Sequence, residues 1–335
     1  MTSVWYTPPS YEPHFPDAPP SSPSRDVGVH PRAPRQEGAR QPEASELSDL
    51  FLMRGRGFLF MPTKARYPTG VKPLLVEEAA RRRRIESRFV EMLGRAGFEE
   101  VVLPIIDYAD PYAPLLDRDA VRRSYRFVDR EGELVAIRSD FTPMLARALA
   151  PALEPADLPL KVFYRGDVIR CEASRLGENR ELFQIGAEIV GDPSPDADAE
   201  AMLLAANIAR ELGLRPLVVY SDVSIAAALE PAARAALATK SAASPDLTLD
   251  DVAAFAPQAA ARLREVARIV GERDFVLQLD DVDDPGYYTG IRFRLFDAAT
   301  RAKIAQGGRY DSLYARFGSA AAAIGFTFTL DEVRA

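Results

Sequence analysis

The sequence predicts an α+β fold, in which a largely antiparallel sheet is flanked by helices. Segments with the two-residue alternation of strands follow one another directly, while the predicted helices stand apart from them. The longest predicted helix, at about 76–96, carries Ile85, Phe89 and Leu93 on one stripe. The chain of 335 residues is 47% hydrophobic, which is sufficient for a sizeable core.

Composition excludes several classes of function. The formal net charge is −7, and no apolar run of about 18 residues or more occurs, so we expect neither a membrane span nor a broad basic surface for nucleic acid. Cys171 is the only cysteine, and the two histidines, His14 and His30, lie near the N-terminus. Thiolate metal sites and imidazole catalysis are therefore not expected. Without the pattern of a secretory signal, the protein is expected to be cytoplasmic and to carry no cofactor.

The N-terminal part differs in composition from the rest. Residues 1–46 are rich in Pro, Ser, Gly and Arg and are expected to form a disordered tail, because they can bury little apolar surface. A folded core is expected over 47–335. Its first elements are the helix at 76–96, which Gly97 ends, and a strand at 100–105.

The remaining elements are strands and helices in alternating groups. Thr142 and Pro143 have the positions of an N-cap and a first helical residue, so a helix is expected through Leu149. The Ala-rich segment at about 223–272 is expected to be a helical insertion in the core. The glycine pair at 307–308 is expected at the end of a strand, where a tight turn is one explanation. The other predicted elements are strands at 124–128, 134–138, 160–172, 181–191, 216–221, 275–279, 288–296, 302–306 and 323–330, and helices at 195–213 and 311–316.

The predicted hairpin at 160–172 and 181–191 has one polar face. Side chains two apart share a face of a strand, and a glycine in mid-strand indicates that another group approaches the backbone. One such strand would be an ordinary solvated face, but two neighbouring strands that combine glycine with ionic groups favour a ligand-binding surface. The residues expected on it are Tyr164, Gly166, Arg170, Glu172, Gln184, Gly186 and Glu188, and those expected toward the core are Phe183, Ile185, Ala187 and Ile189.

Further polar side chains are candidates for the same ligand. Asp140 and Thr142 lie two apart at a strand-to-helix junction, and Tyr288 opens a strand. An ammonium group needs carboxylates, and an imidazole needs one acceptor and one donor. Two carboxylates, at Asp140 and Glu188, with the amide of Gln184 and the phenol of Tyr288, would therefore suit a small cationic or N–H-rich ligand.

From about residue 68 onward, the chain resembles the catalytic core of class II histidyl-tRNA synthetases. The resemblance covers most of the expected core, and its motifs occur in the family's order. They are Pro104 in VLPIID for the first class II motif, Arg170 and Glu172 followed by Gln184-x-x-x-Glu188 for the second, GYYTG (286–290) and GGRYD (307–311) for the histidine-specific segments, and AIGFTFTLDE (323–332) for the third.

The resemblance implies a six-stranded antiparallel sheet, flanked by helices, in a protein that is usually dimeric with Pro104 at the interface. It also implies a role for Arg170, which matches the arginine that contacts the α-phosphate of ATP and the substrate carboxylate. The residues that it assigns to a histidine-binding pocket are Asp140, Thr142, Arg170, Gln184, Glu188, Tyr287 and Tyr288.

Two positions depart from the synthetase pattern. Glu332 replaces the third motif's arginine, which grips the ATP triphosphate, and Asp283 replaces an arginine five residues before Tyr288. At an effective dielectric of about 20, unit charges ~4 Å apart interact by about 4 kcal/mol, so these acids are expected to repel ATP. Arg334 would lie on another side of a helix and is a poor substitute. The sequence ends at Ala335, so no anticodon-binding domain is expected.

A synthetase-like core that keeps its amino-acid pocket but loses its ATP site resembles the regulatory subunits of ATP phosphoribosyltransferase. That resemblance implies no catalytic activity of the chain's own. It implies a hetero-oligomer with a short-form ATP phosphoribosyltransferase catalytic subunit, at the first step of histidine biosynthesis, with free histidine as effector. A homodimer is expected within that complex, with neither nucleic acid nor membrane as a partner.

Three other functions remain as alternatives. One is a truncated histidyl-tRNA synthetase that activates histidine with ATP, and another is an enzyme that makes a different aminoacyl product. The third is a nucleic-acid-binding module that uses the run Arg81–Arg84 and Arg32, Arg35 and Arg40 of the tail. The same run also fits a solvated helix face with carboxylates nearby.

Overall fold

The computed structural model describes residues 67–115, 124–171, 179–238, 247–271, 273–281, 283 and 286–333 of the chain. The chain divides into two units, residues 1–62 and 63–335, and all of the described residues belong to the second. The predicted tail at 1–46, and Glu172 and Arg334, lie outside the described residues.

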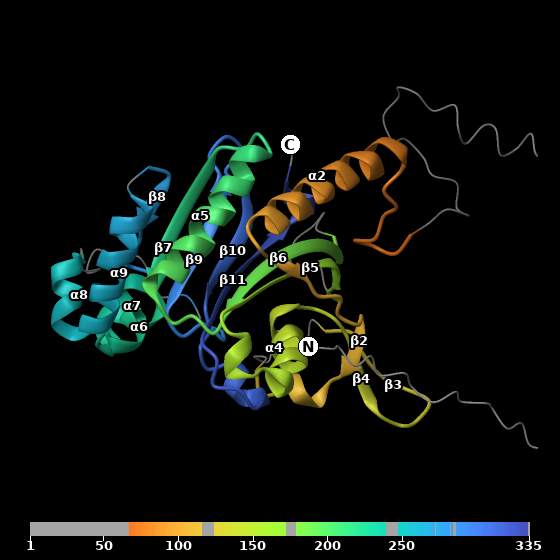
Figure 1. Cartoon of the computed structure of the whole chain (residues 1–335), viewed down its shortest axis with the longest axis horizontal. Helices are drawn as coiled ribbons and strands as arrows, with labels where there is room; N and C mark the ends of the chain where they lie inside the picture. The colour runs from red at the N-terminus through yellow and green to blue at the C-terminus, as the bar shows by residue number, and fades with distance from the viewer. Residues whose placement is uncertain are drawn as a thin grey trace, which may run out of the picture. The chain divides into compact units, whose positions relative to one another are not determined.

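The second unit is built on an eight-stranded sheet (Figure 1). In spatial order its strands are β1 (Glu99–Glu100), β5 (Leu160–Ile169), β6 (Glu181–Val190), β11 (Ala323–Thr329), β10 (Lys303–Arg309), β9 (Ile291–Asp297), β7 (Pro216–Asp222) and β8 (Phe275–Leu277). The six strands from β5 to β7 are all antiparallel, and the short edge strands β1 and β8 pair in parallel with their neighbours. The predicted α+β class and largely antiparallel sheet are confirmed.

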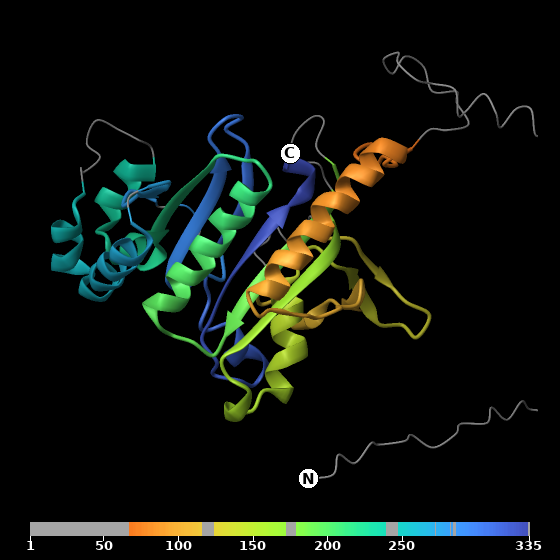
Figure 2. The same cartoon turned by 45° about the horizontal axis from the view of Figure 1, so that its top comes forward.

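One face of this sheet is covered by three helices, α2 (Val76–Arg95), α5 (Pro195–Glu211) and α9 (Pro257–Val270), which share one apolar core with it. Figures 1 and 2 show α2 and α5 lying across the same side of the strands. The predicted stripe of α2 is buried in this core. The segment predicted as a helical insertion contains α6 (Val223–Ala228), α7 (Pro231–Ala238), α8 (Leu249–Phe255) and α9.

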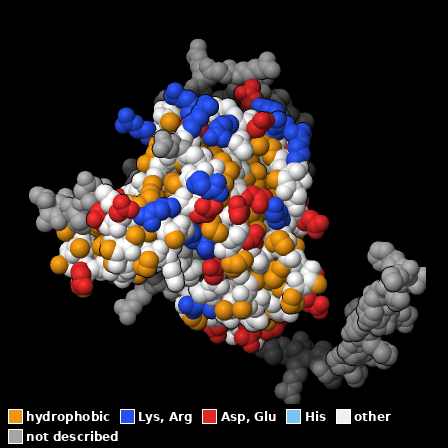
Figure 3. Space-filling view, turned by 60° about the vertical axis from the view of Figure 1, so that its left-hand side comes forward, with side chains coloured by type: hydrophobic (Ala, Val, Ile, Leu, Met, Phe, Trp, Pro, Cys, Tyr) orange, Lys and Arg blue, Asp and Glu red, His pale blue; other side chains and the backbone are white. Residues whose placement is uncertain are grey.

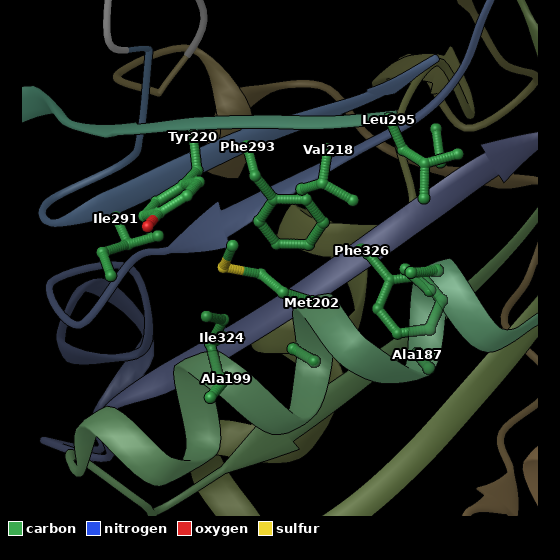
Figure 4. Packing of buried hydrophobic residues seen from close by; sticks show 14 of the residues in the cluster. Ala187, Ala199, Met202, Val218, Tyr220, Ile291, Phe293, Leu295, Ile324 and Phe326 are labelled. Carbon is green, nitrogen blue, oxygen red and sulfur yellow. The ribbon is translucent and has the colours of Figure 1, made fainter. Parts of the chain in front are cut away.

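Helix α5 shows how local sequence positions an element on the sheet. Its N-terminus is capped by Ser194, whose side chain accepts a hydrogen bond from the Ala197 N–H, and Pro195 takes the first helical position. Met202 of α5 is fully buried and points toward Phe293 of the sheet (Figure 4). Burial of one such side chain contributes about 1.5–3 kcal/mol.

The opposite face of the sheet is covered by α4 (Thr142–Leu149). Phe141, Met144 and Leu145 pack there against Val162, Tyr164 and Val168 of β5. A second, antiparallel sheet precedes α4 in the chain, with the strand order β2 (Ile106–Tyr108), β4 (Leu134–Ile137) and β3 (Arg126–Val128). Short 3-10 helices are η2 (Asp110–Tyr112), η3 (Ala150–Ala152), η4 (Pro155–Asp157), η5 (Tyr314–Phe317) and η6 (Leu330–Glu332).

The predicted strand at 100–105 is wrong. Pro104 lacks the N–H that a ladder would need. The carbonyl oxygens of Leu103 and Pro104 accept hydrogen bonds from the Arg138 guanidinium at 2.9 and 3.0 Å. An arginine side chain therefore takes the place of a neighbouring strand along this segment.

The glycine pair at 307–308 does not form a turn but lies within β10. A Cβ on Gly307 would lie 2.3 Å from the carbonyl oxygen of Gly325, and one on Gly308 would lie 2.8 Å from the Tyr288 ring. Both glycines are therefore explained by close approach of neighbouring strands and rings.

Three further local predictions need correction. The strand predicted at 288–296 begins at Ile291, so Tyr288 precedes it. The helix predicted at 311–316 is a turn followed by η5. Thr142 is the first residue of α4 and not its N-cap, because Phe141 occupies the cap position. No helix in the described part of the chain is both long and apolar enough to cross a membrane.

Candidate functional site

The residues predicted to bind a ligand come together in one pocket, on the α4 side of the main sheet. The pocket contains about 380 Å³ of space, part of it open to solvent. The predicted residues in its lining are Asp140, Thr142, Arg170, Gln184, Glu188, Tyr287 and Tyr288. The lining is completed by Gln306, Gly307, Tyr310, Gly325, Phe326 and Thr327.

The register of β5 and β6 produces the polar face of the hairpin. Gly166 lies opposite Gln184, and Tyr164 lies opposite Gly186. The alternate residues Ile185, Ala187 and Ile189 of β6 enter the core, so the predicted division of faces is confirmed for this strand. A Cβ on Gly186 would lie 2.3 Å from Tyr164 Oη. This glycine therefore makes room for a side chain of the protein itself rather than for a ligand.

Glu188 is the most enclosed acid of the pocket, with 1% of its surface exposed. Its Oε1 accepts hydrogen bonds from Thr142 Oγ1 at 2.9 Å and from the Tyr164 hydroxyl at 3.2 Å. The Tyr310 hydroxyl donates to its Oε2. A Cβ at position 325 would overlap that carboxylate, which explains why Gly325 faces it.

Glu188 has no cationic partner among the described residues, because its three hydrogen-bond partners are neutral hydroxyl groups. Burial raises the pKa of Glu188 from 4.5 to about 8, although these hydrogen bonds act in the opposite direction. This environment therefore favours a neutral Glu188 at pH 7. A bound cation would favour the ionised form.

Asp140 is the second acid of the pocket. Its Oδ1 accepts a hydrogen bond from the Thr142 N–H at 3.0 Å, which fixes the carboxylate at the start of α4. Its Oδ2 accepts one from the Tyr287 hydroxyl at 3.4 Å. Burial raises the pKa of Asp140, against these hydrogen bonds and the charge of Arg170. Burial, and then the charges of Asp140 and Glu188, raise the pKa of Tyr288.

Sequence reasoning missed three polar residues of the lining. Thr327 pairs with Gly186 and its hydroxyl lies 2.7 Å from that of Tyr164. Gln306 pairs with Thr327 from the other side. Alternation along the last two strands could have placed both residues on the pocket face. Tyr310 follows the end of β10, and no periodic signal predicts its contact with Glu188.

Asp283, predicted to repel ATP, is not a free charge. Its Oδ2 lies 2.6 Å from the guanidinium of Arg294. Asp281 pairs with the same arginine at 3.1 Å and with Arg292 at 2.5 Å. Two acids and two arginines thus neutralise one another. These ion pairs leave the two arginines less available to a phosphate. The repulsion of ATP by Asp283 stays a prediction.

Glu332, the other predicted replacement, is exposed on η6. Its charge acts on Lys303 of β10, where it favours the ammonium form. Neither Glu332 nor Asp283 lines the pocket that contains Glu188.

Comparison with known proteins identifies the family of this chain. A sequence profile described as "Histidyl-tRNA synthetase" matches residues 70–256 and 224–333. A protein of Anaeromyxobacter dehalogenans named ATP phosphoribosyltransferase regulatory subunit is 32% identical over 310 residues, which cover 79% of this chain and 89% of that protein. One of the same name from Geobacter sulfurreducens is 31% identical over 316 residues, 80% of this chain and 72% of that protein. The chain belongs to the histidyl-tRNA synthetase-like family of ATP phosphoribosyltransferase regulatory subunits.

Solved structures show the fold of this family. A Bacillus halodurans protein described as an ATP phosphoribosyltransferase regulatory subunit/histidyl-tRNA synthetase matches with a TM-score of 0.71 and 22% identity, over 82% of this chain and 83% of that one. Apo histidyl-tRNA synthetase of S. aureus matches with a TM-score of 0.62 and 20% identity, over 80% of this chain and 72% of that one. The predicted class II synthetase-like fold is confirmed.

For this family member, the arginine run of α2 is largely occupied within the protein. Arg82 pairs with Asp167 at 2.9 Å, and Arg83 pairs with Glu86 at 2.6 Å. Lys, Arg, Asp and Glu side chains are interspersed over the face shown in Figure 3. These contacts favour a solvated, ion-paired helix face over a nucleic-acid surface. Among the described residues, no group of His, Cys, Asp and Glu could hold a metal ion.

Proposed function

We propose that this chain is the regulatory subunit of an ATP phosphoribosyltransferase. It acts with a separate short-form catalytic subunit at the first step of histidine biosynthesis, and free histidine binds in the Glu188 pocket as the effector. Relatives about one-third identical over most of the chain carry this name. Histidine can shift the equilibrium between two arrangements of the subunits only if it binds one arrangement more tightly than the other.

The observation that carries the proposal is that neither acid of the pocket is paired with a cation in the part of the chain that the structure describes. Asp140 and Glu188 are both held by hydroxyl or backbone donors, and neither forms an ion pair within the described residues. An ammonium group or an imidazolium of a ligand would give these carboxylates the cationic partner that they lack. The amide of Gln184 can act as donor or acceptor for the other ring nitrogen. Free histidine carries all of these groups.

We also propose that the chain has no catalytic activity of its own. Histidine activation would require cations that grip ATP phosphates. Arg292 and Arg294 are engaged by Asp281 and Asp283, and Glu332 supplies no cation. The predicted truncated synthetase is therefore disfavoured by the ion pairs of β9.

Calorimetric titration with histidine tests the pocket. The wild-type chain is expected to bind histidine, and Asp140→Asn is expected to weaken binding about 10- to 100-fold, because a charged hydrogen bond is lost. Asp196→Asn, an exposed acid on α5, is the matched control and should leave affinity unchanged.

The purified short-form catalytic subunit should form phosphoribosyl-ATP faster with this chain, and histidine should suppress the gain. No heat with histidine, alone or with the partner, would remove the pocket from the proposal, and histidine-dependent ATP–pyrophosphate exchange would contradict the lack of catalysis.

We further propose that the chain forms a homodimer through an apolar strip formed by residues 102–108 and the small sheet. Large exposed apolar areas mark interfaces. Val102 is 86% exposed, and the other large apolar side chains exposed in this region are Ile105, Ile106, Tyr108, Phe127, Val128 and Leu134. Sedimentation equilibrium should give a dimer for the wild type and a monomer for Val102→Asp. A monomeric wild type at micromolar concentration contradicts this proposal.

A further inference from the structure

The β10 side of the pocket carries a pair of polar residues with a defined orientation. Lys303 Nζ donates a hydrogen bond to Gln306 Oε1 at 3.0 Å, and Gln306 lines the pocket. Because its amide oxygen is engaged by an ammonium group, Gln306 can offer a ligand its NH₂ group. Both groups on this side are therefore donors, suited to a ligand acceptor.

Strand register separates these donors from the acids of the pocket. Gln306 lies opposite Thr327, which lies opposite Gly186 of β6. Gly186 precedes Glu188 by two residues, or about 7 Å along the strand, and β10 lies two strands from β6, or about 10 Å across the sheet. The pocket thus has an acidic side at Glu188 and a donor side at Gln306.

The charges near this donor side are not balanced within the described residues. Arg170, which also lines the pocket, and Lys303 form no ion pair there, whereas Arg294 is paired. Desolvation, and then the charges of Arg294 and Arg170, lower the pKa of Lys303, while Glu332 acts in the opposite direction. An anion between Arg170 and Lys303 would relieve this repulsion.

We propose that Lys303 and Gln306 form, with Arg170, the carboxylate-binding side of the pocket. A zwitterionic amino acid then places its cationic groups at Asp140 and Glu188 and its carboxylate at the donor side. These residues select free amino acids over their amides and over decarboxylated amines. The inference rests on the proposed function and deepens it, since it assigns the basis of specificity for the effector.

Titration of the full chain with L-histidine, L-histidinamide and histamine tests this assignment. The wild type should prefer histidine to both analogues by at least about tenfold, the value of one charged hydrogen bond. Lys303→Met and Gln306→Leu should each remove most of that preference by weakening histidine alone. Lys303→Arg should keep it. Arg301→Gln is the matched control, because it removes one positive charge just before β10 from a side chain that, unlike Lys303, is not hydrogen-bonded to a lining residue among the described residues.

The outcomes separate the inference from the proposed function. If the wild type binds histidine and Lys303→Met weakens all three ligands equally, or none, the carboxylate side is wrong and the proposed function stands. Displacement of histidinamide by millimolar inorganic phosphate, without any preference for histidine, would also overturn it, because the site would then take phosphate. Absence of histidine binding to the wild type overturns both proposals. Unchanged thermal midpoints establish that these exposed substitutions leave the fold intact.

Discussion

Two buried carboxylates on opposite faces of the main sheet have contrasting partners. Glu188 faces the pocket and is surrounded by three neutral hydroxyl groups. Asp198 of α5 is 0% exposed and lies between two guanidinium groups, those of Arg309 at 2.7 Å and Arg262 at 2.5 Å. The same chemical group is therefore supplied with positive charge on one face of the sheet and left without it on the other.

The difference separates a structural acid from a binding acid. Burial raises the pKa of both groups, but the two arginines oppose this effect at Asp198. Arg309 also donates to the backbone carbonyl oxygens of Asp192 and Ser194, so that network is complete within the protein. Removing a member of such a network destabilises the fold, because a buried charge is then left without its partner. At Glu188, under the proposed function, the bound ligand supplies the cation.

The largest expected effect follows from breaking the completed network. Asp198→Asn removes the fully buried carboxylate partner of Arg309, which is 2% exposed and keeps the more exposed Asp311 at 3.0 Å. We expect a loss of about 3–5 kcal/mol in the free energy of unfolding, the range for removing one partner of a buried pair. Urea titration measures this loss. Asp196→Asn, on the exposed side of the same helix turn, should change stability by less than about 0.5 kcal/mol. Equal effects for the two substitutions would show that the network contributes nothing beyond surface charge.

Sequence alternation was sufficient for the hairpin, because β5 and β6 are long, regular and adjacent in the chain. The same reasoning placed Gln184 and Glu188 on the pocket side and Ile185 in the core, as the structure confirms. The contact of Tyr310 with Glu188 joins residues 122 positions apart, and only the register of the three strands β6, β11 and β10 brings them together. Local patterns carry no information about such a pairing.

Charge patterns were harder to interpret than apolar ones. The predicted effect of Asp283 on ATP took no account of Arg294, which pairs with Asp283. The strand predicted at 100–105 is wrong because Arg138 comes from a different segment to bind the carbonyl oxygens of Leu103 and Pro104. Long arginine side chains reach partners that sequence spacing does not reveal.

The smaller effect is a pH dependence of stability that should come from Glu188. The pKa of Glu188 in the folded chain, about 8, lies above its ordinary value of 4.5. Its contribution to stability is then fully present below pH ~4.5 and is lost as pH rises toward ~8, because the unfolded chain releases the proton first. Between pH ~5 and ~8 this amounts to about 4 kcal/mol, from about 1.4 kcal/mol for each pH unit.

Glu188→Gln should remove this slope, since an amide does not titrate, and the variant should equal or exceed the wild type in stability near pH 8. Urea unfolding at several pH values between ~5 and ~8 gives the slope directly. Glu181→Gln, an exposed acid on the same strand, is the control and should leave the slope in place. If the wild type and Glu188→Gln keep parallel pH profiles, Glu188 is ionised in the empty pocket. In that case a cation of the protein itself would have to stabilise the Glu188 carboxylate, as Arg309 and Arg262 stabilise Asp198, and a ligand would not be needed to supply it.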